Sequence, residues 1–310
     1  MRSQPGGPTG PSRRPCQDGP VQQAAVDQLV EVLDLESIEV NIFRGSSPDH
    51  DAQRVFGGQV AGQALVAAAR TVDGERHVHS LHAYFLRPGD PTVPILYEVD
   101  RIRDGRSFAT RRVVAIQHGR AIFNLSASFH VPEEGFDHQD EAPADTPDPE
   151  TLPDFATRWR TLLGDREVDW LDRPRPIDIR HVDWTPQLDR GPLPPHSRVW
   201  LRADGALPDD PVLHTCVVTY ASDMTLLDTT LLPHGRSFVE QDVMMASLDH
   251  AMWFHRPFRA DEWLLYAQDT PSASGGRGLA RGLFFDRAGA LVASVVQEGL
   301  IRPWQPPPER

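Results

Sequence analysis

A duplicated motif constrains the fold of this chain more than any other feature of its sequence. The segment HSLHAYFLRPGD, His79–Asp90, has a partial copy in SLDHAMWFHRPF, Ser247–Phe258, and both contain Phe-x-Arg-Pro. In both copies a tyrosine, Tyr97 or Tyr266, follows nine residues after the proline. Matching spacings in two segments of one chain indicate an internal repeat. A chain of 310 residues is long enough for two cores of ordinary size, so we expect two related halves.

Each half is predicted to consist of one helix followed by antiparallel strands. In the first half, Phe56–Val72 forms a helix that two glycines open and alanines fill, so that a sheet can wrap closely around it. Strand-like runs separated by short turns follow at His79–Leu86, Ile95–Arg103, Phe108–Gln117 and Ala121–His130. In the second half, Pro211–Leu227 is the counterpart helix. This order predicts an α+β fold, with the two sheets side by side as one continuous unit.

The predicted halves are separated by a stretch of different composition. Residues 1–20 are rich in proline and glycine and are expected to be a disordered tail, and the amphipathic segment Val21–Leu33 then begins the first half at 21–133. Residues 134–176 form an acidic, proline-rich linker with a short helix at Phe155–Leu163. The second half occupies residues 177–304.

Composition excludes several classes of function. The net charge of −13 argues against a nucleic-acid or anionic-membrane partner. Every basic residue is arginine, which excludes Schiff-base and P-loop lysine chemistry. Two cysteines are too few for a disulfide framework or a cysteine-based zinc site, and Cys216 is expected to be a small buried hydrophobe. Because the chain has neither an apolar run of about 18 residues nor a secretory signal, we expect a soluble cytoplasmic protein.

A set of motifs, in the same order along the chain, resembles the acyl-CoA thioesterase II family of double-hotdog hydrolases. They are VFGGQVAGQAL, HSLHAYFLRPGD, RDGRSFATRRV, YASDM, LDHAMWFHRPF, WLLY and VASVVQEGLIR, and the resemblance extends over residues 29 to 302. The resemblance implies a double hotdog, two tandem antiparallel sheets that each wrap around a central helix. It also implies hydrolysis of fatty acyl-CoA to free acid and coenzyme A, with an Asp, a Thr or Ser and a Gln holding the attacking water.

Carried over motif by motif, these residues are Asp223, Ser247 and Gln297. Ser247 stands where many relatives have threonine, so the hydroxyl is kept and the methyl group is lost. Independently, Asp223 falls on the apolar stripe of its predicted helix, where a carboxylate needs partners or a function. Gln297 alternates with apolar residues on one strand face. For both, a structural role satisfied by neighbouring polar groups is the alternative interpretation.

Other kinds of hydrolytic site find little support in the sequence. No G-x-S-x-G motif is present, so a nucleophile-elbow serine hydrolase is not indicated. His250 and His255 are five residues apart and would point to opposite faces of a strand, which argues against a shared metal. We therefore expect structural histidines, no metal site and no cofactor.

Two further groups of residues are candidates for substrate contacts. Backbone N–H groups of Gly57, Gly58 and Gln59, where the first predicted helix begins, are oxyanion donors if that end faces the site.

Arginines are needed to bind coenzyme A phosphates on an acidic protein. The candidates Arg277 and Arg281 have the repeat counterparts Arg106 and Arg111, because Arg111 and Arg281 each precede a turn glycine by eight residues. Surface pairing with acidic neighbours is an equally good explanation for each of them.

Three functions remain open from the sequence. The first is an acyl-CoA thioesterase, with Asp223 as general base or orienter of the water. The second is a hotdog acyl-thioester hydratase or dehydratase, which requires an Asp/His pair placed for proton transfer. The third is a non-catalytic acyl-CoA binding protein. By analogy with other hotdog proteins, a homodimer or homotetramer is expected.

Overall fold

The computed structural model describes residues 19–48, 53–163, 171, 173–183, 191–237 and 242–303. The predicted disordered tail therefore lies almost wholly outside the described residues. Part of the predicted linker also lies outside them.

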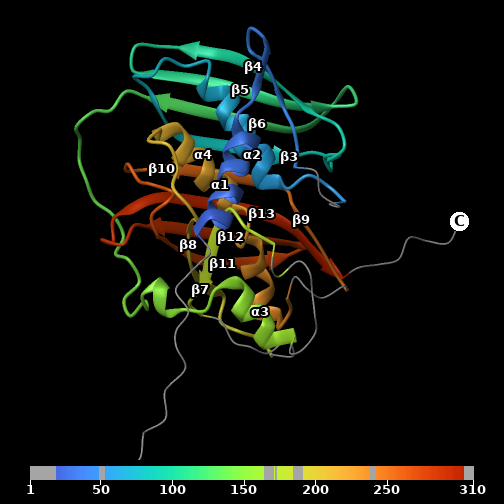
Figure 1. The fold of residues 1–310 in the computed structure, drawn as a ribbon, viewed down its shortest axis with the longest axis vertical. Helices are drawn as coiled ribbons and strands as arrows, with labels where there is room; N and C mark the ends of the chain where they lie inside the picture. The colour runs from blue at the N-terminus through green and yellow to red at the C-terminus, as the bar shows by residue number, and fades with distance from the viewer. Residues whose placement is uncertain are drawn as a thin grey trace, which may run out of the picture.

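The described strands form one continuous antiparallel sheet (Figure 1). Its order is β1-β2-β4-β5-β6-β3-β10-β13-β12-β11-β8-β7, and β9 pairs with β13 beside this path. The first half supplies β1 (Glu36–Glu39), β2 (Ile42–Gly45), β3 (His77–Phe85), β4 (Ile95–Asp104), β5 (Phe108–Gln117) and β6 (Arg120–His130). The second supplies β7 (Ile177–His181), β8 (His196–Ala203), β9 (Val243–Ser247), β10 (Asp249–Phe254), β11 (Leu264–Ser274), β12 (Arg277–Phe285) and β13 (Leu291–Pro303).

The duplicated motif forms the junction between the two halves. Strand β3 carries the first copy and β10 the second, and the two strands pair antiparallel, with His82 opposite Ala251. The expectation of a continuous sheet is therefore confirmed, and the two copies of the repeated motif form the strand pair that joins the halves.

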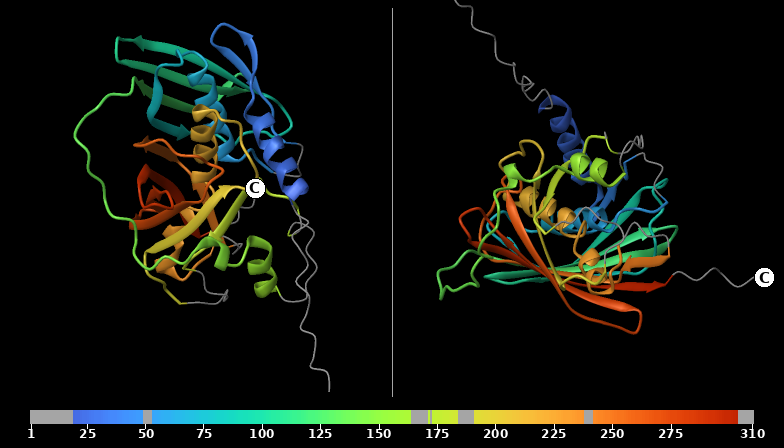
Figure 2. Two further views of the ribbon diagram at one scale, coloured as in Figure 1. Left: turned by 60° about the vertical axis from the view of Figure 1, so that its left-hand side comes forward. Right: turned by 90° about the horizontal axis from the view of Figure 1, so that it is seen from below.

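Two central helices, α2 (Gly57–Ala69) and α4 (Pro211–Ser222), lie inside the curve of the sheet, one for each half (Figure 2). Nearly every residue of α2 is buried, as its small side chains predict. The two helices cross closely because a Cβ on Gly58 would lie only 2.3 Å from the carbonyl oxygen of Tyr220. This is the predicted double-hotdog architecture.

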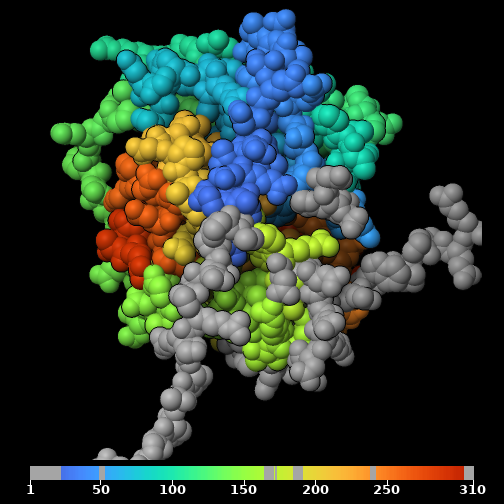
Figure 3. Space-filling view, in the orientation of Figure 1, coloured from blue at the N-terminus to red at the C-terminus, as the bar shows by residue number. Residues whose placement is uncertain are grey.

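Two further α-helices and two 3-10 segments are found in the described part of the chain. Helix α1 (Gly19–Leu33) packs on α2 and is visible beside α4 in Figure 3. Helix α3 (Phe155–Leu163) lies in the linker where a short helix was predicted, after a 3-10 turn, η1 (Pro149–Thr151). A second 3-10 segment, η3 (Leu227–His234), lies against β11, β12 and β13. No helix in the described ranges is long and apolar enough to span a membrane.

The buried core joins both helices to the inner face of the sheet. Cys216 is fully buried, as predicted, and burial raises the pKa of its thiol. Tyr97 and Tyr266, the repeat tyrosines, are both fully buried at matching places. The Tyr97 hydroxyl donates to Gln63, and the Tyr266 hydroxyl donates to the carbonyl of Ser222.

The structure departs from the predicted elements in two places. The short strands β1 and β2 were not predicted, because their sequence has little apolar alternation. The predicted helix Pro211–Leu227 ends at Ser222, and its apolar pattern continues into η3 after a short turn. Asp223 is therefore the residue that caps the helix rather than a member of its buried stripe.

Candidate active site

Asp223 stands where α4 ends. The helix begins after Asp210, whose side chain caps the N-H of Val212, and Pro211 occupies its first turn. Asp223 retains helical dihedral angles, with φ −84° and ψ −2°, and its carboxylate reaches beyond the last turn. A carboxylate at this end of a helix is opposed by the helix dipole, so other groups must stabilise it.

Ser247 and Gln297 supply that stabilisation from neighbouring strands. The Ser247 hydroxyl donates to Asp223 Oδ1 at 3.1 Å, and Gln297 Nε2 donates to the same oxygen at 2.6 Å. Ser247 ends β9 and lies opposite Gly299 of β13, two residues beyond Gln297. The structure thus brings together the three residues that the sequence predicted.

Burial changes the acidity of this carboxyl group. It raises the pKa of Asp223 to about 6, although hydrogen bonds from Gln297, Ser247 and the backbone N–H of Gly58 act in the opposite direction. The charged form is therefore a stronger base than an exposed aspartate, while near neutral pH it stays mostly ionised.

The beginning of α2 faces the same carboxylate. A Cβ on Gly57 would lie 2.7 Å from Asp223 Oδ2, so only glycine allows this approach. Phe56 precedes the helix and provides no side-chain cap, and the first N–H groups of a helix lack intrahelical acceptors. Gly58 already interacts with Asp223, and the Gln59 side chain donates to Ser46 and Ser47. Of the three oxyanion candidates, Gly58 thus already donates its backbone N–H to Asp223.

The Gln297 side chain has one acceptor that no described group satisfies. Its Oε1 is buried and lacks a hydrogen-bond partner, although Nε2 is bonded to Asp223. An amide oxygen held in this way can accept a hydrogen bond from a water molecule.

The sequence did not single out two polar residues next to this site. Ser222 precedes Asp223, and its hydroxyl lies 2.8 Å from Nε2 of the buried His250, whose pKa burial lowers to about 4. His250 is thus a neutral, buried residue, while Nε2 of His255 bonds to Ser294. Asp228, in η3, is a second acid, and burial raises its pKa to about 7. The sequence could have indicated both residues, because Ser222 and Asp228 lie within five positions of Asp223.

The four candidate arginines lie in different environments. Arg281 is on the outer face, where it pairs with Asp269, and Arg106 is exposed in the turn after β4. Arg277 begins β12, pairs with Glu298 at 3.0 Å and lines a cavity. Arg111 is fully buried.

Arg111 is a correction to the prediction. Its guanidinium donates to the hydroxyl and carbonyl of Thr71 and to the carbonyls of Arg103 and Thr110, and it pairs with Asp104. With no exposed surface it has no access to a ligand, and its role is structural.

The repeat counterpart of Arg281 is Arg112 rather than Arg111. Arg112 pairs with Asp100 across β4 as Arg281 pairs with Asp269 across β11. The prediction counted back from the turn glycines, but β12 and β13 are joined by a longer turn than β5 and β6. A slip of one residue moves a side chain to the opposite face of a strand.

The register also explains why the site occurs only once among the described residues. Ala280 lies opposite Gln297, and at the same place in the first half Arg111 lies opposite Ala127. Ser247 lies opposite Gly299, and the equivalent pair in the first half is Val78 opposite Phe129. Helix α2 ends at Arg70 where α4 ends at Asp223. The first half thus lacks the carboxylate, hydroxyl and amide, and the buried arginine occupies the equivalent position.

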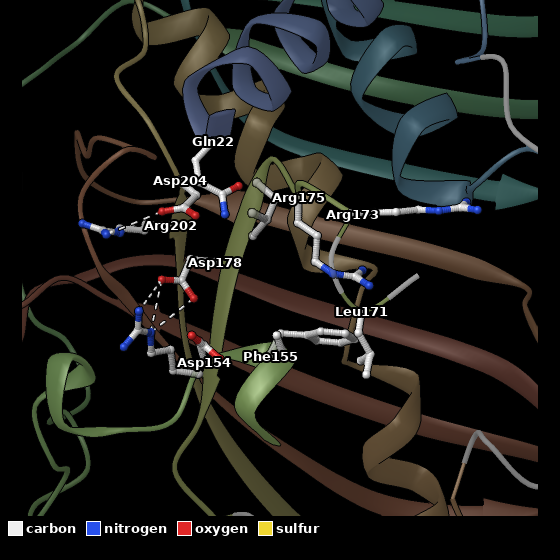
Figure 4. Close-up of a pocket in the computed structure, with 12 residues that line it drawn as sticks. Gln22, Asp154, Phe155, Leu171, Arg173, Arg175, Asp178, Arg202 and Asp204 are labelled. Atoms are coloured by element: carbon white, nitrogen blue, oxygen red, sulfur yellow. Dashed lines mark hydrogen bonds and ion pairs between the residues drawn. The ribbon is translucent and has the colours of Figure 1, made fainter. Parts of the chain in front are cut away.

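A separate cavity of about 400 Å³ lies between α1, α3 and the strands β7 and β8 (Figure 4). Its lining is mainly charged: Asp178 pairs with Arg180, and the Arg175 guanidinium lies 3.8 Å from the ring centre of Phe155. None of the predicted site residues line it. We place the candidate active site at Asp223 instead, because Ser247 and Gln297 meet there.

Comparison with known proteins gives consistent matches over both halves. A family model described as acyl-CoA thioesterase matches residues 175–300, and one described as acyl-CoA thioesterase N-terminal domain matches residues 46–130. Human acyl-coenzyme A thioesterase 8 is 43% identical over 285 residues, which cover 88% of each chain. Acyl-CoA thioesterase 2 of Haemophilus influenzae is 39% identical, covering 89% of this chain and 98% of its own. The crystal structure of an acyl-CoA thioesterase II from Mycobacterium marinum is 48% identical, with a TM-score of 0.74 over 89% of this chain and 99% of that one.

Proposed function

The chain belongs to the acyl-CoA thioesterase II family, and we propose that Asp223, Ser247 and Gln297 hold and activate the water with which it hydrolyses fatty acyl-CoA. The observation that carries this proposal is the convergence of a hydroxyl and an amide on one carboxylate oxygen, beside the N-terminus of α2. All these groups come from separate elements of the fold.

The water would donate one hydrogen bond to the Asp223 carboxylate and the other to Gln297 Oε1. The latter is a buried acceptor that no described group satisfies. Ser247 uses its own proton on Asp223 and keeps that carboxylate oriented. The water oxygen then presents a lone pair to the thioester carbonyl.

Proton transfers then follow in a closed cycle. Asp223 takes a proton as the water oxygen attacks the carbonyl carbon, and a tetrahedral oxyanion forms. Backbone N–H groups of Gly57 and Gln59 stabilise that charge, as donors at the positive end of α2. The carbon–sulfur bond breaks, the coenzyme A sulfur accepts the proton from Asp223, and the free acid leaves. No acyl-enzyme is formed.

Thiol release over a series of acyl chain lengths, with identification of the product, tests the proposal. A thioesterase yields one free thiol and one fatty acid for each acyl-CoA consumed. A hydratase or dehydratase would alter the acyl chain without releasing thiol, and a binding protein would change neither. Detection of a covalent acyl-enzyme by mass spectrometry during turnover would contradict direct attack by water.

We also propose a cytoplasmic enzyme that assembles as a homodimer or homotetramer. The composition and the paired sheets of hotdog proteins support this expectation. Light scattering of the purified protein gives the mass directly, and a mass of one chain of 34.6 kDa would refute the assembly.

A further inference from the structure

A second cavity, of about 380 Å³, lies at the far end of the strands that carry the candidate site. Strand β9 begins near the lower right edge of the molecule in Figure 1 and runs towards its middle, and the cavity lies at the start of the strand, at Val243. Its lining comes from the end of η3, the start of β9, the hairpin between β11 and β12, and the end of β13. These residues include Leu231, His234, Arg236, Val243, Arg277 and Arg302.

Positive charge gathers around this cavity although the whole chain is strongly acidic. Arg236 pairs with Asp242 at 3.2 Å, and Arg277 pairs with Glu298 at 3.0 Å, yet about half of each arginine side chain remains exposed. Arg302 is exposed, and its guanidinium contacts the sulfur of Met244. Among the described residues around the cavity, three guanidinium groups face two carboxylates, and such an excess of positive charge favours an anionic ligand.

The cavity also has an apolar component, because Leu231, Val243 and Ile301 contribute to its lining. Gly275 and Gly276 form the tight turn of the β11–β12 hairpin, with φ values of 59° and 75° that only glycine adopts easily, and so bring Arg277 to the rim. A ligand with several phosphates and a flat apolar ring matches this combination, which is the chemistry of a phosphorylated nucleotide.

The cavity lies within reach of the candidate site along one strand. Val243 lines the cavity and Ser247 bonds to Asp223, and these are the two ends of β9. The strand spans roughly 13 Å at about 3.3 Å per residue. An extended arm such as pantetheine can follow that strand from the phosphates to the thioester.

From these observations we infer that Arg236, Arg277 and Arg302 bind the phosphates of the coenzyme A nucleotide in this cavity while the thioester lies at Asp223. This inference rests on the proposed thioesterase function. It assigns a role to Arg277 among the four arginines that the sequence suggested, and it adds Arg236 and Arg302.

Two thioesters with the same acyl chain separate the nucleotide contacts from the chemistry. One is the acyl-CoA, and the other is the N-acetylcysteamine thioester, which lacks the nucleotide. For Arg302→Ala and Arg277→Ala we expect KM for the acyl-CoA to rise roughly tenfold each, as loss of one charge-assisted hydrogen bond predicts. Both variants should hydrolyse the truncated thioester at the wild-type rate. Arg112→Ala, which removes an equally exposed arginine from the first half, should change neither.

Equal losses on both thioesters, or an unchanged KM for acyl-CoA, would overturn the inference. So would a loss that depends on acyl chain length, because that result would place the acyl chain in this cavity.

Calorimetric titration with coenzyme A and with pantetheine requires no turnover. We expect the wild type to bind coenzyme A at least tenfold more tightly, and Arg302→Ala to lose that difference. If the difference is present without thiol release, the proposed function fails and the nucleotide site stands. If thiol is released but the two ligands bind equally, the nucleotide site fails alone.

Discussion

The raised pKa of Asp223 predicts the pH at which this enzyme becomes active. In the proposed mechanism the carboxyl must be ionised to accept a proton from water, and burial raises its pKa to about 6. At pH 5 only about a tenth of it would be ionised, whereas an aspartate with the ordinary pKa near 4 would be ionised almost completely. We therefore expect kcat/KM to reach a plateau above pH 7 and to fall about tenfold for each pH unit below 6.

The same pKa shift predicts that the free energy of unfolding falls as pH rises, whereas the activity increases. The folded-state pKa lies above the unfolded value, so the folded protein holds the proton more tightly between pH 4 and 6. This contribution is fully present below about pH 4 and is lost as pH rises through 6. A difference of about two pKa units corresponds to roughly 3 kcal/mol in the free energy of unfolding. In Asp223→Asn that dependence should disappear, so the variant gains stability relative to the wild type as pH rises.

Two measurements over pH 4.5 to 8 examine this reasoning. The first is kcat/KM for thiol release by the wild type and by Ser247→Ala. The variant should show a higher midpoint, because the Ser247 hydrogen bond lowers the pKa of Asp223. The second is denaturant unfolding of the wild type and of Asp223→Asn. A kinetic midpoint near pH 4 would refute the role of burial, even if the residue is catalytic.

Further predictions concern the groups around the site and its first-half equivalent. Ser247→Ala should reduce kcat up to about tenfold through loss of one hydrogen bond, while Ser247→Thr should stay within about threefold of the wild type in thiol-release assays. Gly57→Ala places a Cβ against the carboxylate and should reduce kcat about 100-fold, whereas Gly74→Ala, with open space around it, should be neutral. Arg111→Ala should lower the free energy of unfolding by about 3–5 kcal/mol, and Arg112→Ala by about 0.5 kcal/mol or less, as measured by denaturant titration. Equal effects of the two glycine variants, or of the two arginine variants, would contradict the environments assigned to these residues.

The architecture was largely predictable because the repeat recurs in elements with strong local patterns. Helix α2 is rich in alanine, and buried and exposed residues alternate along β5 and β6. The Phe-x-Arg-Pro copies indicate the two central strands, β3 and β10. The strands β1 and β2 were not predictable in this way. They are short and polar, and their pairing with β4 is a tertiary contact.

The structure brings the three candidate site residues together, but their arrangement was not predictable from the sequence. Asp223, Ser247 and Gln297 were recognisable from motifs, yet Asp223 was expected within a helix that in fact ends one residue earlier. That the N-terminus of α2 faces this carboxylate depends on how two helices from different halves cross, which no local pattern encodes. Arg111 was misassigned because one added turn position shifts the register of the repeat.

The central claim is that Asp223 activates the attacking water, and the thiol-release rate of Asp223→Asn tests it most directly. Asparagine keeps the size and the hydrogen-bond acceptor but cannot take a proton. With saturating acyl-CoA at pH 7.5, kcat should fall on the order of 10² to 10⁴-fold while coenzyme A binding is unchanged. A variant that folds and retains kcat within tenfold of the wild type would contradict the mechanism.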